Sequence, residues 1–96
     1  MSEKEKQNRI IVTVLGKDKV GIIAGITGVL ADLNANILDI RQTIMQEFFT
    51  MIMIVDISKC RVDFDTLLAR LQAKGEELGV KVNAQHEDVF SFMHRI

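Results

Sequence analysis

The hydrophobic and polar positions of this chain follow the two periods of regular secondary structure. A continuous β-branched run at residues 10–14 is typical of a strand, and apolar residues that recur every three or four positions after residue 20 indicate a helix. The pattern predicts six elements in the order strand, helix, strand, strand, helix, strand. Their expected ranges are Arg9–Leu15, Val20–Leu33, Ile37–Gln46, Phe48–Ile57, Phe64–Leu78 and Val80–Val89.

This order of elements is the split βαβ arrangement of ferredoxin-like folds. Right-handed crossovers then place both helices on one face of a four-stranded antiparallel sheet. We therefore predict an α+β, ferredoxin-like fold with the order βαββαβ. Residues 1–8 are expected to be a flexible N-terminal tail and residues 9–96 a single domain, because a chain of 96 residues leaves no room for a second core.

The ends of both predicted helices carry residues that commonly start or stop helices. Asp18 is a plausible N-cap of the first helix and Asp63 of the second, because a carboxylate accepts hydrogen bonds from the unpaired N–H groups of a first turn. Asn34 and Gly79 follow the last helical positions and tolerate the left-handed backbone conformation. We therefore expect the two helices to end at these residues.

The third predicted strand is apolar on both of its faces. Two helices cover only one face of a four-stranded sheet, so a second copy of the chain is the simplest cover for the other face. Such a pair could form face to face, which the apolar strand favours, or side by side through edge strands. One face of this strand carries Phe49, Met51, Met53, Val55 and Ile57, and the other carries Phe48, Ile52 and Ile54.

An apolar segment, VFSFMHRI at residues 89–96, follows the last predicted strand. Its composition is too apolar for a solvated tail. We expect it to pack as a short helical turn on the domain or on a partner.

Composition and charge limit the cellular compartment and the classes of partner that we expect for this chain. The net charge is −1, and no basic block marks a nucleic-acid groove. No apolar stretch approaches the roughly 20 residues of a membrane helix, and residues 1–9 lack the apolar segment of a signal peptide. Cys60 is the single cysteine, which argues for a reducing compartment. We expect a cytoplasmic protein that binds neither nucleic acid nor membranes.

Three known uses of this fold require chemistry that the sequence lacks. Copper chaperones use a C-x-x-C loop, whereas this chain has Cys60 alone. RNA-recognition motifs stack bases on aromatic residues of the central strands, but the adjacent Phe48 and Phe49 point to opposite faces. Acylphosphatase-like sites need an arginine in the loop after the first strand, where this chain has Lys17 and Lys19.

The sequence also lacks the residue patterns of catalysis and metal binding. No nucleophile–base pair or carboxylate pair is brought together by the predicted elements, so we expect no enzymatic activity and no cofactor. His86, Glu87, Asp88 and His94 do not follow the spacing of a standard zinc site, and we interpret them as surface residues.

Two segments that flank the first helix carry a family signature. Residues 16–26 read GKDKVGIIAGI and residues 34–40 read NANILDI. They resemble the ACT domain signature, in which an acidic or amide residue precedes a Gly-apolar-apolar helix start and an Asn-Ile pair opens the second strand. Val20 stands where many ACT domains have proline. The resemblance covers nearly the whole chain, and the segments FFTM and FMHRI are similar to short stand-alone ACT proteins of bacteria and archaea, a family with no firmly assigned role.

The resemblance implies a ligand site between two copies of the chain, near the loop after the first strand and the start of the second. The N–H groups at a helix start suit a carboxylate, and Gly21 lets a ligand approach the backbone. Asp18, Asn36 and Asp39 could receive an ammonium group, although an N-cap, a helix end and a solvated strand residue are their ordinary roles. The implied positions are Gly16, Asp18, Gly21, Ile22, Asn36, Ile37 and Asp39.

These observations lead to two hypotheses of function. The first is a regulatory module that binds an amino acid or a similar small molecule as a homodimer or higher homo-oligomer, and that acts on a separate protein chain. The alternative is a protein-interaction or scaffold module of the same fold with no metabolite ligand.

Overall fold

The computed structural model describes residues 8–88. The predictions made for the tail before residue 8 and for the apolar segment 89–96 lie outside these residues. So does the expected end of the last strand at Val89.

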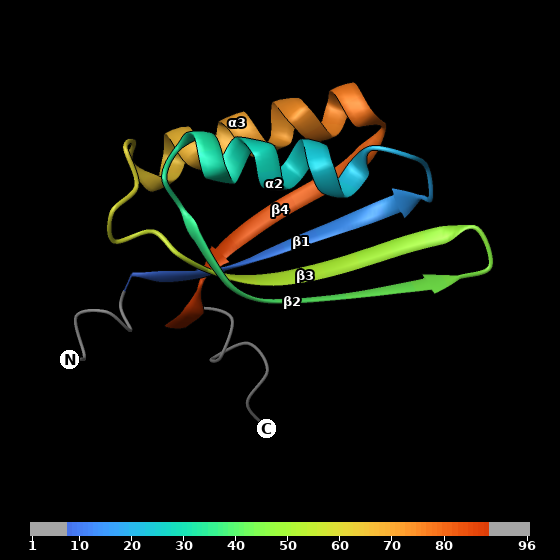
Figure 1. Ribbon diagram of the computed structural model, residues 1–96, viewed down its shortest axis with the longest axis horizontal. Helices are drawn as coiled ribbons and strands as arrows, with labels where there is room; N and C mark the ends of the chain where they lie inside the picture. The colour runs from blue at the N-terminus through green and yellow to red at the C-terminus, as the bar shows by residue number, and fades with distance from the viewer. Residues whose placement is uncertain (1–7, 89–96) are drawn as a thin grey trace.

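The fold is the predicted one, an α+β sandwich with the order βαββαβ. Its sheet has four strands in the spatial order β2-β3-β1-β4, and every neighbouring pair is antiparallel. Figure 1 shows both helices on one face of this sheet. The elements are β1 (Arg9–Lys17), α2 (Ile22–Asp32), β2 (Asn36–Met45), β3 (Phe48–Asp56), α3 (Phe64–Leu78) and β4 (Val80–His86).

The hydrophobic core lies between the helices and the sheet. Alternate residues of β1 and β3 point toward the helices, and each helix packs one apolar stripe against them. The sheet contributes mainly β-branched residues and methionines to this core, and the helices contribute mostly leucine and isoleucine. Phe49 is the only aromatic residue among the buried core residues that the structure describes. The fully buried side chains are Ile10, Val12, Val14, Ile22, Ile26, Leu30, Met51, Met53, Val55, Leu67 and Leu71.

Three of the four helix ends were predicted correctly. Asp63 caps α3, and its Oδ1 accepts a hydrogen bond of 2.9 Å from the N–H of Thr66. Gly79 ends the same helix with a left-handed backbone at φ 78°. Asn34 follows α2 with φ 64°, which is the conformation expected of a residue that turns the chain into the next strand.

The start of α2 was predicted wrongly. The N-cap is Gly21, at φ 96° and with no side-chain hydrogen bond, and the helix begins at Ile22 and not at Val20. Asp18 is drawn instead toward the hairpin between β2 and β3, because its N–H donates to the carbonyl of Glu47 at 2.8 Å. β1 is consequently two residues longer than the prediction and runs to Lys17.

Strand β2 lies at the edge of the sheet and contains a β-bulge. Ile37 pairs with Val55 and Asp39 with Ile54, so Leu38 is an extra residue without a partner. The hairpin turn to β3 consists of Gln46 and Glu47, with Gln46 in the left-handed conformation at φ 58°. The sequence marked this turn weakly because it contains neither glycine nor asparagine.

The face of the sheet opposite the helices carries the other set of alternate residues. Ile11, Ile52 and Ile54 share this face, as the pairing of β1 with β3 requires. Leu15 and Phe48 stand farther along it and are 53% and 48% exposed. We call this surface the open face. Among residues 8–88 no helix has the length and apolar character needed to cross a bilayer.

The cap of α3 gives a testable dependence of stability on pH. Hydrogen bonds from Thr66 lower the pKa of Asp63 in the folded state. The cap therefore contributes stability above the unfolded pKa of about 4, and this contribution is lost as the pH falls through the lower folded value. In thermal unfolding, the wild type should be more stable than Asp63→Ala at pH 7 and lose this advantage in acid.

Asp63→Asn is the matched control, because asparagine caps a helix but does not titrate. Its advantage over Asp63→Ala should persist at low pH. An advantage of the wild type that stays constant down to pH 2 would contradict this account of the cap.

Candidate functional site

Four of the seven predicted site residues lie at one end of the sheet. They lie at the end of β1, in the loop that follows it and at the first residue of α2, and they are Gly16, Asp18, Gly21 and Ile22. This loop touches the hairpin turn between β2 and β3 through the bond from Asp18 to Glu47. Figure 1 shows the loop and the hairpin turn at the same end of the molecule. We call this set the loop half of the site.

The other three residues lie at the opposite end of the sheet. β1 and β2 both run antiparallel to β3, which lies between them, so they point in the same direction and start at the same end of the sheet. Ile37 and Ile10 pair with the same residue of β3, Val55, and so lie at the same height in the sheet. Ile44 and Gly16 likewise both pair with Phe49. Six residues of strand separate the two levels, which is about 20 Å at ~3.3 Å per residue. We call Asn36, Ile37 and Asp39 the strand half of the site.

The loop half offers backbone N–H groups and one carboxylate. A Cβ on Gly21 would have no atom within 4 Å, so the start of α2 is open to solvent, and no side chain caps it. Ile22 as a whole is 1% exposed and anchors the helix in the core, so its side chain is not available to a ligand. The carboxylate of Asp18 is exposed.

The packing of the sheet requires a glycine at position 16, independently of any ligand. A Cβ at this position would lie 2.7 Å from Cγ1 of Val80 and 3.1 Å from the Cα of the same residue. β1 and β4 therefore pair closely at this point only because residue 16 has no side chain.

The strand half contains three residues that face different surroundings. Asn36 is exposed and lines a small polar pocket of about 330 Å³ together with Asn34, Asp56, Ser58 and Lys59. Ile37 is half-buried against the edge of the core. Asp39 is exposed, and its Oδ1 accepts a hydrogen bond of 2.8 Å from the N–H of Ile40.

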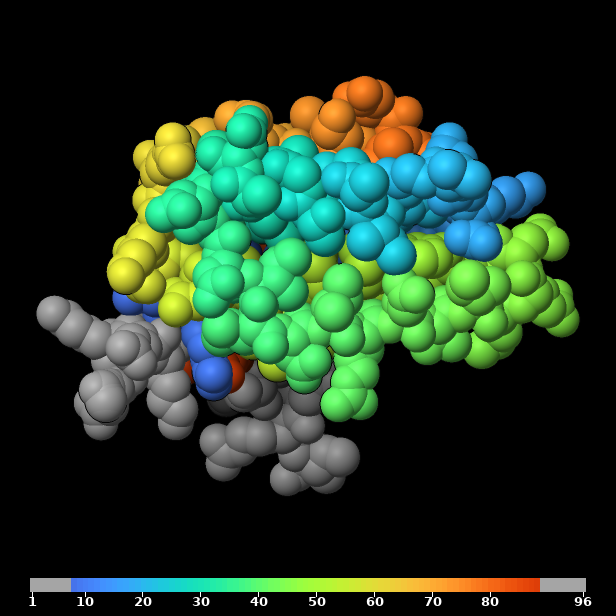
Figure 2. All heavy atoms as spheres, in the orientation of Figure 1, coloured from blue at the N-terminus to red at the C-terminus, as the bar shows by residue number. Residues whose placement is uncertain are grey.

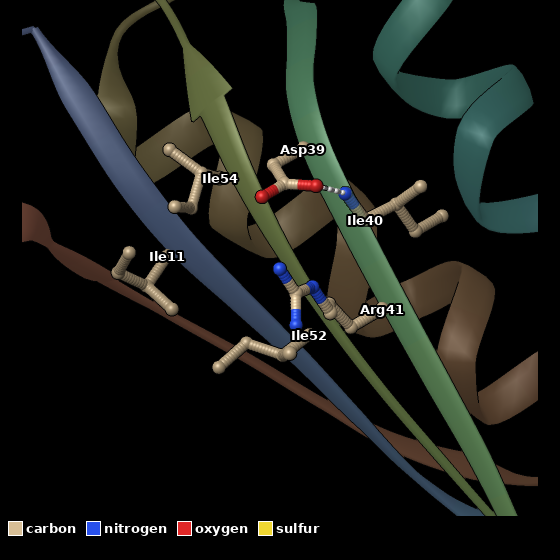
Figure 3. Close-up of a pocket in the computed structure, with 6 residues that line it drawn as sticks. All are labelled: Ile11, Asp39, Ile40, Arg41, Ile52 and Ile54. Carbon is tan, nitrogen blue, oxygen red and sulfur yellow. Dashed lines mark hydrogen bonds between the residues drawn. The ribbon is translucent and has the colours of Figure 1, made fainter.

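A larger pocket of about 390 Å³ lies on the open face. Figure 3 shows Asp39 and Arg41 of β2 beside Ile52 and Ile54 of β3, whereas the side chain of Ile40 points away from them. Ile11 of β1 completes the lining. The alternation of residues 52 and 54 was a signal for an apolar patch here, but no pattern in the sequence marked Ile11 or Arg41 as part of it.

The edge strand β2 also exposes apolar side chains on the side of the sheet that carries the helices. Ile40 and Ile44 pair with Met53 and Phe49, which face the core, yet they are 41% and 53% exposed. Leu38, at the bulge, is 47% exposed. Figure 2 shows the side chains of β2 below α2, with neither helix covering them.

The residues that we interpreted as surface residues at the end of β4 have ordinary structural partners. The ring of His86 lies against that of Phe64, with centroids 4.4 Å apart. Glu87 accepts a hydrogen bond of 3.0 Å from Nε of Arg9, and this contact raises the pKa of Arg9. Within residues 8–88 no group of three or more His, Cys, Asp or Glu side chains is placed to hold a metal ion. His94 lies beyond these residues.

The sequence profile of the ACT domain matches residues 8–85 of this chain. The chain belongs to the ACT domain family. A UPF0237 protein of Methanocaldococcus jannaschii is 61% identical over 89 residues, which are 93% of this chain and 99% of that protein. The resemblance found in the signature segments and the predicted fold are thereby confirmed.

Solved structures place this ACT domain among proteins of different sizes. An ACT domain protein from Streptococcus pneumoniae has a TM-score of 0.74 at 41% identity and covers 92% of this chain and 96% of its own. The regulatory subunit of aspartate kinase from Thermus thermophilus has a TM-score of 0.64 at 18% identity, and the match covers 82% of this chain and 51% of that one. The second likeness shows the fold alone.

Proposed function

We propose that this ACT domain is a regulatory module that binds an amino acid at a site shared by two copies of the chain. ACT domains are generally regulatory ligand-binding modules, and this protein has the ACT signature at both halves of the site. The observation that carries the proposal is the separation of these halves. They lie about 20 Å apart in one protomer, so one small ligand contacts both only if they come from two chains.

The free edge of β2 supplies a way to join the two halves. When a twofold axis pairs β2 with β2 of a second copy, the two strands run antiparallel. The start of the partner's β2 then lies beside the end of β2 in the first protomer, next to Glu47 and therefore next to the loop half. Each dimer contains two such sites, and the exposed Ile40 and Ile44 lie between the halves on the side that carries the helices.

The chemistry of the two halves suits the two ends of an amino acid. The uncapped N–H groups at the start of α2 favour a carboxylate, because they carry the positive end of the helix dipole. Asp18 and, from the other copy, Asn36 can accept hydrogen bonds from an ammonium group. The ligand would act by favouring one arrangement of the dimer, to the extent that it binds that arrangement more tightly.

The first test is thermal unfolding against a panel of the common amino acids at millimolar concentration. A ligand at 100 times its dissociation constant adds ~2.7 kcal/mol to the stability of the folded state, which corresponds to a shift of order 10 °C for a domain of this size. We expect such a shift with at least one amino acid, and its loss in Asp18→Ala and in Asn36→Ala. A flat panel would contradict the proposal.

A complementation test asks whether the site is shared. Asp18→Ala and Asn36→Ala should each abolish binding when alone, since every site in either dimer lacks one half. In an equal mixture half of the dimers are mixed, and each mixed dimer contains one intact site. Calorimetry should therefore recover about a quarter of the wild-type binding capacity. Zero recovery after subunit exchange would indicate a site within one protomer.

A scaffold role without a metabolite is the second candidate. The observation that favours it is the apolar open face, where Leu15 and Phe48 are about half exposed. Under this hypothesis a protein complex recovered from cells should survive Asp18→Ala and Asn36→Ala and be weakened by Phe48→Asp.

A further inference from the structure

The open face contains a groove that neither helix covers. Its floor is formed by Ile11, Ile52 and Ile54, and its wall by the charged side chains of Asp39 and Arg41. The groove has a volume of about 390 Å³, which lies in the range of cavities that hold several side chains or a small ligand. An apolar floor of this kind is unfavourable in water unless something occupies it.

Exposure varies along the open face in one direction. Leu15 and Phe48, at the end of the sheet near the hairpin turn, are 53% and 48% exposed, whereas Ile11, at the other end, is only 6% exposed. The helices lie on the opposite face and do not contribute to this burial. The end of the sheet at Ile11 is also the end at which β4 stops, because His86 pairs with Ile10.

The chain leaves β4 next to this groove. Glu87 is hydrogen-bonded to Arg9 at the start of β1, which holds the end of β4 beside the strand that carries Ile11. The sequence that follows, residues 89–96, is VFSFMHRI, with apolar side chains at five of eight positions. A segment of this composition is stabilised when its large apolar side chains are removed from water.

The groove lies within reach of this segment. Neighbouring strands are ~4.8 Å apart, so the distance from β4 across β1 and β3 to Arg41 on β2 is roughly 14 Å. Eight residues span ~12 Å as a helix and up to ~26 Å when extended. Phe92 is the sixth residue after His86, so it can lie ~9 Å from the end of β4 in a helix and ~20 Å when extended. Ile11 lies one strand from β4 and Ile54 two strands, or about 10 Å. The ring of Phe92 can therefore reach the isoleucine floor.

We propose that residues 89–96 dock in the groove of the open face of their own chain. The apolar side chains cover Ile11, Ile52 and Ile54, and the segment takes the place that a second copy would need for face-to-face pairing. The edge of β2 then remains the surface available for a partner copy. This inference does not require the proposed ligand, although Asp39 belongs both to the strand half of the ligand site and to the wall of the groove.

The proposal is tested on the wild-type protein by nuclear Overhauser effects between the phenylalanine rings and the isoleucine methyl groups. Contacts of Phe90 or Phe92 with Ile11, Ile52 or Ile54 are expected. A sample mixed from labelled and unlabelled chains separates contacts within one chain from contacts between chains. Contacts between chains only would show that a second copy occupies the groove, and no contacts would show that it is empty; either result overturns the proposal.

Disulfide trapping provides a second measurement. In a Cys60→Ser background, Ile54→Cys combined with Phe90→Cys or with Phe92→Cys should form an intramolecular disulfide under mild oxidation in at least one pair. The matched control combines the same tail cysteine with Thr66→Cys, an exposed position on α3 beyond the other face of the sheet. The Ile54 pair should close at least tenfold more than this control. Equal yields would contradict docking at the groove.

Discussion

Leu71→Ala is expected to lower the free energy of unfolding by about 2–5 kcal/mol, because it leaves a cavity where a fully buried leucine joins α3 to the core. A domain of this size has a total stability of order 5–14 kcal/mol, so the variant approaches the limit of folding. At ~4–8 °C per kcal/mol, the melting temperature should fall by roughly 8–40 °C. Differential scanning calorimetry measures the change.

Leu38→Ala is the control for this prediction. It removes the same atoms from a leucine that is 47% exposed at the edge of the sheet. Its melting temperature should change by only a few degrees. A loss as large as that of Leu71→Ala would show that β2 is covered in solution, which is itself evidence for pairing at this edge.

The second large effect concerns two glycines, one in each helix, whose replacement by alanine should change the free energy of unfolding in opposite directions. Alanine is favoured over glycine inside a helix by about 1 kcal/mol. At Gly75, however, a Cβ would lie 2.6 Å from Cγ2 of Val82 and 2.9 Å from the carbonyl oxygen of Val80. The backbone of β4 cannot yield without breaking its pairing with β1, so Gly75→Ala should destabilise the protein by about 1–3 kcal/mol.

Gly28→Ala is the matched variant in the other helix. A Cβ at Gly28 would have no atom within 4 Å, and the residue is exposed. Here the helical preference acts alone, and a gain of up to about 1 kcal/mol is expected. Chemical denaturation of both variants gives the two free energies. The same sign for both would show that the close contact of α3 with β4 does not decide the outcome.

Secondary structure was predictable wherever one side of an element is buried. The alternation from Phe49 to Val55 and the helical stripe from Leu67 to Leu71 exist because each element has one face in the core. β2 shows the limit of this reasoning. It is exposed along most of its length and contains a bulge at Leu38, so its alternation changes phase within the strand. Arg41, which lies beside Asp39 on the open face, was therefore not singled out from the sequence.

The candidate site was predictable as a set of residues but not as an arrangement. The residues of the two halves lie only 14–23 positions apart in the sequence, and the direction of β1 and β2 carries them to opposite ends of the sheet. Asp18 was misjudged for a related reason. Its partner, the carbonyl of Glu47, belongs to a turn 29 positions later that local helix-capping rules do not include.

The bulge at Leu38 also bears on the solubility of the protein. An edge strand with a long, regular row of unpaired N–H and C=O groups is a template on which further chains can add, as in amyloid fibres. The extra residue interrupts this row and increases the local twist, so that the regular row is confined to Asp39–Met45. The exposed isoleucines are thus displayed on a short template, which favours a closed pair over a growing fibril.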